Sequence, residues 1–386
     1  MHPRIKSLAT NFVLALASIL VVLVGTEVFL RLFPQVLPIE SRMRLQWAQP
    51  DSADVTRADP FTGFVYAPHL RHHYSAGEVT FDYSTDEYGF RNPSPWPDSA
   101  DIVVVGDSEV FGFGVSDDSM WTNVLQHELP HTRVINLGLS MMAPEQYRRV
   151  YEKFGARVHP KLLIFGLFPE NDLSDQVEFD KWLAAGSPGN FAKWKYVHGA
   201  TPSRLQSLLQ RSALYWFVYI SRHRDHRSNE VKPQTFADGS QLHFAPYFLQ
   251  REARLSTPKS AAFQSVMRSI EQCREEAARN GTAMLVIMLS TREDVYLPLR
   301  GDSVPRLMAP FANALAERGI PYLDLTAPMQ RVAREGKRLF FEVDLHPDAA
   351  GSRVIADAVA ANIRQNAAAY HLRLGGTGVI ATAHPF

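Results

Sequence analysis

Five short apolar runs, separated by segments with helical spacing, constrain the fold of this chain more than any other feature. Each run has three to seven residues and almost no polar ones, as is typical of strands buried on both faces of a parallel sheet. The runs are Ile102–Val105, Val134–Asn136, Leu162–Phe165, Ala283–Leu289 and Tyr322–Leu325. Helices are expected over about 119–129, 144–156, 258–279, 304–318 and 348–366. The alternation predicts an α/β protein with helices packed around a central parallel sheet.

The composition excludes several classes of protein. Lys and Arg together number 40, as do Asp and Glu, so the formal net charge is zero. A nucleic-acid-binding or polybasic membrane-surface protein normally has a basic excess, so we expect neither activity. Hydrophobic residues make up 46% of the chain, which excludes a mostly disordered protein. The single cysteine, Cys273, excludes an intrachain disulfide and a multi-cysteine metal site, and no metal or cofactor is expected.

The N-terminus carries a candidate membrane helix. Residues 7 to 26 include no charged side chain, and a helix of these 20 residues would be about 30 Å long, the thickness of a bilayer core. Arg4 and Lys6 precede the run, so residues 1–6 are expected in the cytoplasm. We therefore predict a single-pass signal-anchor over 7–33 in the inner membrane, with the rest of the chain on the periplasmic side. A cleaved signal peptide is the alternative, although no Ala-x-Ala pattern follows. A buried core helix is a third interpretation.

The remaining segments are expected to serve the α/β domain, which spans 100–366. Residues 34–99, with strand-like pieces such as Val79–Tyr83, are interpreted as a connector that packs onto that domain. Residues 173–255 interrupt the alternation and are interpreted as an insertion with one helix over about 202–221. Its aromatic residues would either form a platform for sugar rings or the insertion's own small core; they are Trp182, Trp194, Tyr196, Tyr215 and Trp216. Residues 367–386 form a tail, and Thr257 is expected to cap the helix over 258–279.

Two short motifs far apart in the sequence indicate nucleophilic chemistry. Gly106-Asp107-Ser108 directly follows the apolar run Ile102–Val105, which places a serine at the carboxyl end of a strand. A serine hydroxyl needs a base to take its proton. In the segment Asp344-Leu-His346, residues i and i+2 share one face, so the carboxylate can orient the imidazole. Each motif alone is also an ordinary turn, and together they predict a Ser–His–Asp arrangement.

Two further loops are placed to stabilise an oxyanion. Asn171 follows the run Leu162–Phe165, and its side-chain amide can donate hydrogen bonds. The segment Asn136–Met141 begins at the end of another run and offers backbone N–H groups. Both segments contain residue types that are common in turns. However, all four loops lie at the predicted carboxyl ends of strands or close the domain, where such folds bind ligands.

These motifs, in this order, resemble the SGNH hydrolase superfamily, the GDSL-type esterases and acyltransferases. The resemblance covers roughly residues 100–175 and 280–366. It implies a three-layer α/β/α sandwich, with Ser108 as nucleophile and His346 and Asp344 as base and acid. It also implies that Asn171 and the backbone N–H of Met141 form the oxyanion hole.

The chain departs from the family pattern at two positions. The second block usually has a glycine where this chain has Met141, so Gly138 is the alternative backbone donor. The family's acid usually lies three residues before the histidine, a position held here by Val343. Asp344 lies two residues before it, a spacing that we associate with relatives that modify polysaccharides. Glu342 is a more distant alternative.

The implied reaction is acyl transfer through an acyl-Ser108 intermediate. Water as acceptor makes the protein an esterase, whereas a sugar hydroxyl makes it an O-acyltransferase. Because the predicted anchor places the domain outside the cytoplasm, we expect an acylated carbohydrate of the envelope or an exported glycan, or a small ester, as substrate. The alternative is a catalytically weak glycan-binding or assembly component that retains the fold.

Overall fold

The computed structural model describes residues 3–38, 41–42, 44–45, 55–198, 208–222 and 231–374. The chain divides into two compact units. The first comprises residues 1–52 and 201–232, and the second comprises residues 53–200 and 233–386. Part of the predicted insertion, residues 201–232, therefore groups with the N-terminal segment, whereas its two flanks group with the α/β domain.

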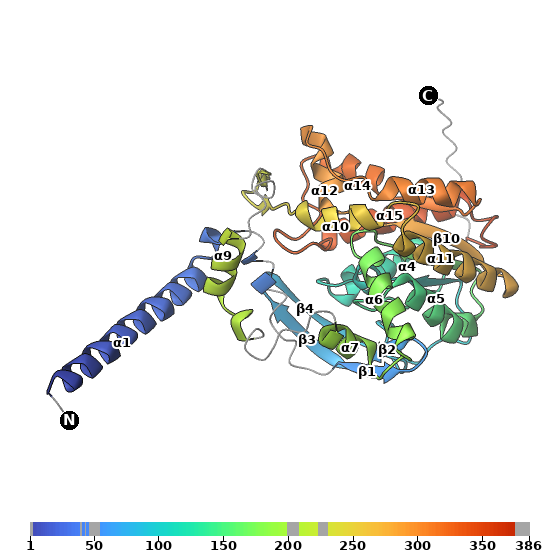
Figure 1. Ribbon diagram of the computed structural model, residues 1–386. Coiled ribbons are helices and arrows are strands. Elements are labelled where there is room, and N and C mark those ends of the chain that lie inside the picture. Colours follow the sequence, from blue (N-terminus) through green and yellow to red (C-terminus); the bar gives the residue numbers. More distant parts are fainter. Residues whose placement is uncertain are drawn as a thin grey trace. The chain divides into compact units, whose positions relative to one another are not determined.

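A five-stranded parallel sheet forms the centre of the second unit, in the order β11-β10-β7-β5-β6. Figure 1 shows its strand β10 beside α11 (Ala261–Arg279). The strands are β5 (Ile102–Val105), β6 (Val134–Asn136), β7 (Leu162–Leu167), β10 (Ala283–Met288) and β11 (Tyr322–Asp324). They coincide with the five predicted apolar runs, so the expected α/β fold is confirmed. The next strand along the chain, β6, lies on one side of β5, and β7 lies on the other. In such sheets ligands bind beyond the carboxyl ends of the strands at the point of reversal, which here is the carboxyl end of β5.

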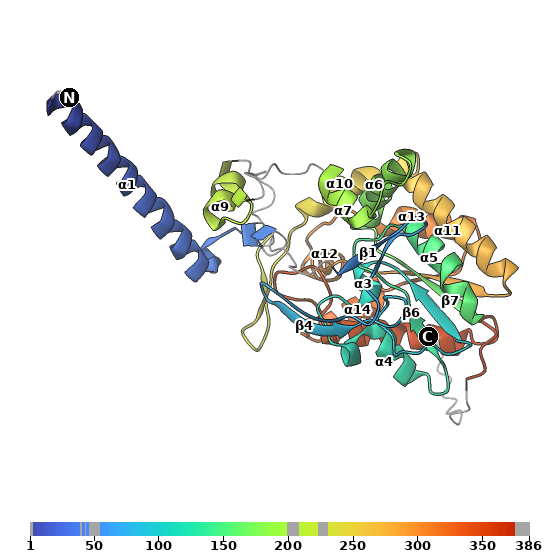
Figure 2. The same cartoon turned by 90° about the horizontal axis from the view of Figure 1, so that it is seen from below.

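Helices cover both faces of the sheet. Figure 2 shows α5 (Pro144–Lys153) and α11 (Ala261–Arg279) on one side and α4 (Trp121–Glu128) on the other, and α15 (Ala349–Gln365) packs against α4. Alternate strand residues explain the first face, because they share a buried core with α5, α11 and α13 (Met308–Glu317). Those strand residues include Val103, Val105, Leu163, Phe165, Val286 and Met288. The three-layer arrangement expected from the sequence is thus present.

The prediction of the cap of α11 is wrong. The helix begins at Ala261, and its N-cap is Ser260, whose Oγ accepts a hydrogen bond from the N–H of Phe263 at 3.0 Å. The hydroxyl of Thr257 instead donates to the carbonyl of Arg254. Ser260 satisfies a free N–H group of the first turn, which is the physical reason for the later start.

Residues 55–99 pack onto the sheet domain through two hairpins. The first joins β1 (Thr56–Asp59) and β2 (Gly63–Tyr66), and the second joins β3 (Arg71–Ala76) and β4 (Val79–Ser84). Every second residue of β4 is buried, so Val79, Phe81 and Tyr83 enter the main core. The buried Arg91 donates to the carbonyls of Phe111, Gly112 and Val115. The segment thereby contacts the turn that follows the predicted nucleophile.

The predicted insertion, residues 173–255, contains several helices rather than one. They are α6 (Asp172–Ala184), α7 (Phe191–His198), α9 (Ala213–Arg222) and α10 (Tyr247–Leu255), with a small hairpin of β8 (Gln234–Thr235) and β9 (Gln241–Leu242). Trp182 is fully buried against Phe179 and Phe191, so it serves the core and not a sugar platform. The side chain of Tyr196 and residues 201–207 lie outside the described part of the chain.

The described part of the first unit contains a long helix, α1, and the shorter α9. Helix α1 spans Pro3–Leu32, and its stretch Asn11–Leu32 is long and apolar enough to cross a membrane. Glu27 joins it to α9, because its carboxylate accepts hydrogen bonds from the Ser212 hydroxyl and from the N–H groups of Ala213 and Leu214. A side chain of α1 thus caps the N-terminus of α9.

Candidate active site

Ser108 lies at the carboxyl end of β5, where it begins the short helix α3 (Ser108–Phe111). Asp107 is the N-cap of that helix, and its Oδ1 accepts a hydrogen bond from the N–H of Glu109 at 3.0 Å. The loop after β6 approaches α3 closely, and a Cβ at Gly138 would lie only 2.4 Å from the backbone nitrogen of Phe111. Only glycine allows this approach, because the obstructing atoms belong to the backbone.

The structure brings Ser108, His346 and Asp344 together from opposite parts of the chain. Nε2 of His346 lies 2.8 Å from Oγ of Ser108, and Nδ1 lies 2.6 Å from Oδ1 of Asp344. Both distances are hydrogen-bonding distances. Ser108 and Asp344 are 8% and 2% exposed, so the chain of contacts is sheltered from water but reachable at the serine. With Nδ1 donating to the carboxylate, Nε2 is left as the acceptor for the serine hydroxyl.

The loop that carries Asp344 and His346 is fixed by two charged side chains that sequence reasoning missed. The carboxylate of Glu78, in the turn between β3 and β4, accepts hydrogen bonds from the N–H groups of Glu342, Val343 and Asp344. On the other side, Nη1 of the fully buried Arg292 donates to the carbonyls of Val343 and Asp344, at 2.8 and 3.1 Å. Both side chains contact the backbone of the loop, so these contacts cannot be predicted from a pattern of side chains in the sequence.

Glu342, the alternative acid, points elsewhere. Its Oε1 lies 3.0 Å from Nη1 of Arg338, with which it forms an ion pair. The side chain of Val343 has no acidic group, and its backbone forms the contacts with Glu78 and Arg292 described above. Among the three residues considered for the acid position, Asp344 is therefore the one whose carboxylate contacts His346.

Several buried charges act on His346. Burial favours its neutral form, but the charge and the hydrogen bond of Asp344, together with the charges of Glu109 and Asp107, outweigh this effect and raise its pKa to about 9. In Asp344, burial opposes ionisation, but the attraction and hydrogen bonds of His346 lower the pKa below its ordinary value. The pair is therefore stabilised as imidazolium and carboxylate.

Two more acids lie beside the serine. Burial raises the pKa of Glu109 to about 8 and that of Asp107 to about 6. Oε1 of Glu109 is buried without a hydrogen-bond partner among the described residues, and the carboxyl interacts electrostatically with His346. Sequence reasoning missed Glu109, although it directly follows the Gly-Asp-Ser motif.

The predicted oxyanion donors differ in their hydrogen bonds and backbone conformation. Nδ2 of Asn171 donates one hydrogen bond to Oδ2 of Asp107 at 3.0 Å, which orients the amide and leaves its second N–H for another acceptor. Met141 has a φ of 69°, the left-handed conformation that a glycine adopts without strain. The alternative donor, Gly138, is already engaged, because its N–H bonds to Oδ1 of Asn136 at 2.8 Å. Gly138 is therefore not available as an oxyanion donor.

A small cavity of about 10 Å³ adjoins the serine and the histidine. Aromatic rings form part of its wall, and the Phe113 ring lies 4.6 Å from the ring of His346. The other lining residues are Glu109, Gly112, Trp121, Pro347, Ser352 and Ile355. Such a volume holds about one water-sized group. No cluster of three metal-ligating side chains occurs among the residues that the structure describes.

Comparison with known proteins links these residues to a family. A family model described as SGNH hydrolase-like domain, acetyltransferase AlgX matches residues 247–379, about a third of the chain. An acetylxylan esterase from Geobacillus stearothermophilus, solved as a catalytic mutant, is 11% identical and aligns over 73% of this chain and 99% of its own, with a TM-score of 0.38. A GDSL-like lipase from Bacteroides thetaiotaomicron is 10% identical over 71% of this chain and 92% of its own, with a TM-score of 0.35.

Likenesses this weak between structures add nothing to the assignment, and no curated protein matches the chain. The family-model match is more specific, because it contains both Asp344 and His346 within an SGNH hydrolase-like domain. The parallel sheet carries Ser108 at the end of β5, in hydrogen-bond contact with that histidine. On these grounds residues 247–379 are similar to an SGNH hydrolase-like domain, in a chain that also carries an apolar N-terminal helix.

Proposed function

We propose that the protein transfers an acyl group from an ester through an acyl-Ser108 intermediate. The observation that carries the proposal is the contact of His346 with both Ser108 and Asp344, at 2.8 and 2.6 Å. In the first step Nε2 of His346 takes the hydroxyl proton as Oγ bonds to the ester carbonyl carbon. The protonated histidine then gives that proton to the leaving oxygen as the old ester bond breaks.

The second step regenerates the serine. An acceptor hydroxyl loses its proton to His346 as its oxygen bonds to the acyl carbon. The bond between the acyl carbon and Oγ of Ser108 then breaks, and His346 returns the proton to Oγ. Asp344 holds the imidazole in the required tautomer throughout. The second N–H of Asn171 and the backbone N–H of Met141 stabilise the oxyanion in both steps. The positive φ at Met141 supports this role, because it is a conformation that glycine adopts without strain, and the family usually has a glycine at this position.

The size of the cavity favours a short acyl group. A volume of about 10 Å³ beside Ser108 is too small to enclose a fatty acyl chain, whereas an acetyl group projects little beyond its carbonyl. The description of the family model that matches residues 247–379 also names an acetyltransferase. We therefore propose acetyl esters as the donors.

The setting of the domain suggests the class of substrate. In this proposal α1 anchors the chain in the inner membrane with the N-terminus in the cytoplasm, so the α/β domain of about residues 100–366 works on the outer side. The substrates are then O-acetylated sugars of the envelope or of an exported glycan. Water as acceptor would make the reaction a hydrolysis, and a sugar hydroxyl would make it a transfer.

A serine-reactive fluorophosphonate tests whether Ser108 is activated. The full-length protein should be labelled, and Ser108→Ala should abolish labelling and lower the turnover of p-nitrophenyl acetate by about a thousandfold or more. Ser99→Ala is the matched control, because Ser99 is exposed and lies outside the cavity lining, so the change should leave labelling and turnover unaltered. A folded wild-type protein that does not react with the probe would contradict the proposal, and would instead favour a glycan-binding or assembly component.

A further inference from the structure

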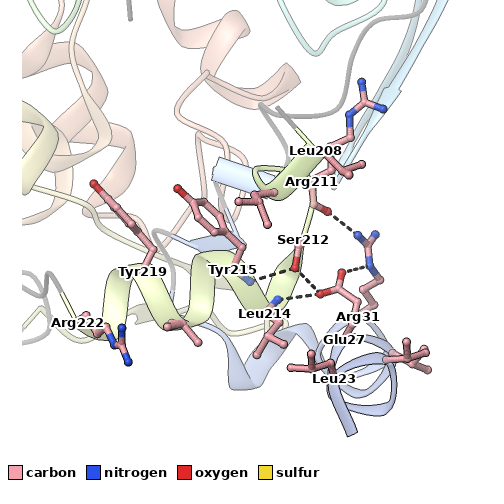
Figure 3. Close-up of a pocket in the computed structure, with 14 residues that line it drawn as sticks. Leu23, Glu27, Arg31, Leu208, Arg211, Ser212, Leu214, Tyr215, Tyr219 and Arg222 are labelled. Carbon is pink, nitrogen blue, oxygen red and sulfur yellow. Dashed lines mark hydrogen bonds and ion pairs between the residues drawn. The ribbon is translucent and has the colours of Figure 1, made fainter. Parts of the chain in front are cut away.

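An apolar groove of about 990 Å³ lies within the first unit, between α1 and the segment of residues 208–222 (Figure 3). One helix face of α1 forms its first wall, with Leu23, Val24 and Val28. The second wall is formed by 208–222, including the apolar Leu214 and Val218. Its volume is at the upper end of the range seen for pockets that hold small molecules.

The groove is built by specific contacts between its two walls. Glu27 of α1 accepts hydrogen bonds from Ser212, Ala213 and Leu214 at the N-terminus of α9. Arg31 in turn donates to Glu27 and to the carbonyl of Arg211, at 2.6 and 2.5 Å (Figure 3). These contacts neutralise the only carboxylate in the groove lining and fix α9 against α1.

The wall contributed by α1 belongs to the stretch that is long enough to cross a membrane. When α1 spans a bilayer, Leu23, Val24 and Val28 lie in or next to the hydrocarbon region, so water is a poor occupant of the groove. The opposite wall is also apolar on its open side, because Leu208 is 66% exposed and Val218 39% exposed. Helix α9 contributes two aromatic residues to the groove lining, Tyr215 and Tyr219, and tyrosine is enriched at membrane interfaces.

The rim of the groove is basic. Figure 3 shows Arg222 at the end of α9 farther from Glu27, with Arg211 near the helix start. Neither guanidinium has a hydrogen-bond or ion-pair partner among the residues that the structure describes. Residues 201–232 contain six Arg or Lys residues and two Asp or Glu residues. A basic segment beside an apolar groove at a membrane surface suits acyl chains joined to anionic headgroups.

We propose that this groove binds anionic glycerophospholipids of the outer leaflet, with their acyl chains along α1 and α9 and their phosphates at Arg211 and Arg222. A membrane helix from a partner would have to supply carboxylates for these two arginines, whereas phospholipids bring a phosphate next to each chain. The inference rests on the anchoring part of the proposed function, since the leaflet reaches the groove only if α1 crosses the membrane.

The test uses the full chain in vesicles of phosphatidylcholine and phosphatidylglycerol in equal parts. A phosphatidylglycerol probe with a diazirine at the end of one acyl chain is cross-linked by light, and the labelled peptides are identified by mass spectrometry. We expect labelling within 208–222, and stronger labelling than with the matching phosphatidylcholine probe. Arg211→Gln and Arg222→Gln should each reduce this preference about fivefold, the effect of about 1 kcal/mol for a basic residue near an anionic surface.

Two further variants make the result specific. Val218→Trp fills the groove and should lower labelling by both probes, whereas Arg268→Gln, an exposed arginine of α11, should change neither. Equal labelling by the two probes would overturn the proposal, as would cross-links from 208–222 to a second copy or another protein in place of lipid.

Failure of the anchor is measured separately. Alkaline carbonate should leave the chain in the vesicles, and its release would overturn both the anchor and the lipid site. The acyl-transfer chemistry would remain testable by fluorophosphonate labelling of Ser108.

Discussion

His346 faces three carboxyl groups, and each of them opposes its role as a base at neutral pH. Asp344, Glu109 and Asp107 all favour the imidazolium, and the pKa of His346 is raised to about 9. A general base must be neutral to accept a proton, so kcat/KM should rise with pH and level off only above about pH 9. Asp344, which positions the histidine, and the two neighbouring acids thus together raise the pH range in which His346 can act as a base.

Removing one of these charges should shift the pH profile. Glu109→Gln deletes a carboxyl that faces His346, so the rise in kcat/KM should move to lower pH. The measurement is the pH dependence of p-nitrophenyl acetate turnover, with the exposed Asp98→Asn as the control variant. An unchanged profile in Glu109→Gln would show that this carboxyl does not act on the base.

The identity of the acid can be decided by a pair of conservative variants. Asp344→Asn keeps the size of the side chain but favours the wrong tautomer of His346, so kcat/KM should fall about 10²–10⁴-fold. Glu342→Gln should be nearly silent, because its carboxylate pairs with Arg338. Melting temperatures of both variants separate a kinetic effect from a loss of stability. An inactive Glu342→Gln beside an active Asp344→Asn would reverse the assignment.

At this scale the sequence predicts side chains that contact each other and misses those that contact backbone. Ser108, Asp344 and His346 belong to recognisable motifs, so they were expected, and the structure brings them within hydrogen-bond distance. Glu78 and Arg292 hold the same loop through peptide groups, which every residue has. Their positions depend on the packing of distant segments and therefore cannot be predicted from the local sequence.

At the scale of elements, the hairpin of β3 and β4 positions the histidine loop. Glu78→Ala removes the acceptor of three N–H groups in 342–344, so the loop should shift and kcat/KM should fall about tenfold or more. Thr80→Ala, an exposed change on the same hairpin, should leave kcat/KM unaltered. If Glu78→Ala turned over substrate as the wild type does, the loop would hold its geometry without the clamp.

The strands were predictable as elements because burial on both faces leaves continuous apolar runs. The starts of helices were less predictable than the strands. The N-cap of α11 is Ser260, whereas the sequence predicted Thr257. The grouping of α9 with α1 could not be predicted, because it depends on tertiary contacts between distant segments. Glu27 meets the start of α9, and Leu30 packs in one apolar cluster with Ala213. Secondary structure follows local patterns, whereas such pairings are set by tertiary contacts.

For the whole molecule, the charge flanking α1 predicts the orientation. A reporter fused after Phe386 that works only outside the cytoplasm should be active, because Arg4 and Lys6 hold the N-terminus inside. The anchor is also expected to remain on the mature protein. An N-terminal sequence that began near residue 30 would contradict the uncleaved form, and an active cytoplasmic reporter would contradict the orientation.

The distance along the chain between Ser108 and His346 also sets when activity can begin during synthesis. The two residues are separated by 238 positions, and the serine and the Glu78 hairpin leave the ribosome first. At about 5–20 residues per second, the histidine follows about 10–50 s later. In the proposed function and topology, a nascent chain therefore carries an unactivated serine through membrane insertion, and acyl transfer begins only after His346 has been exported.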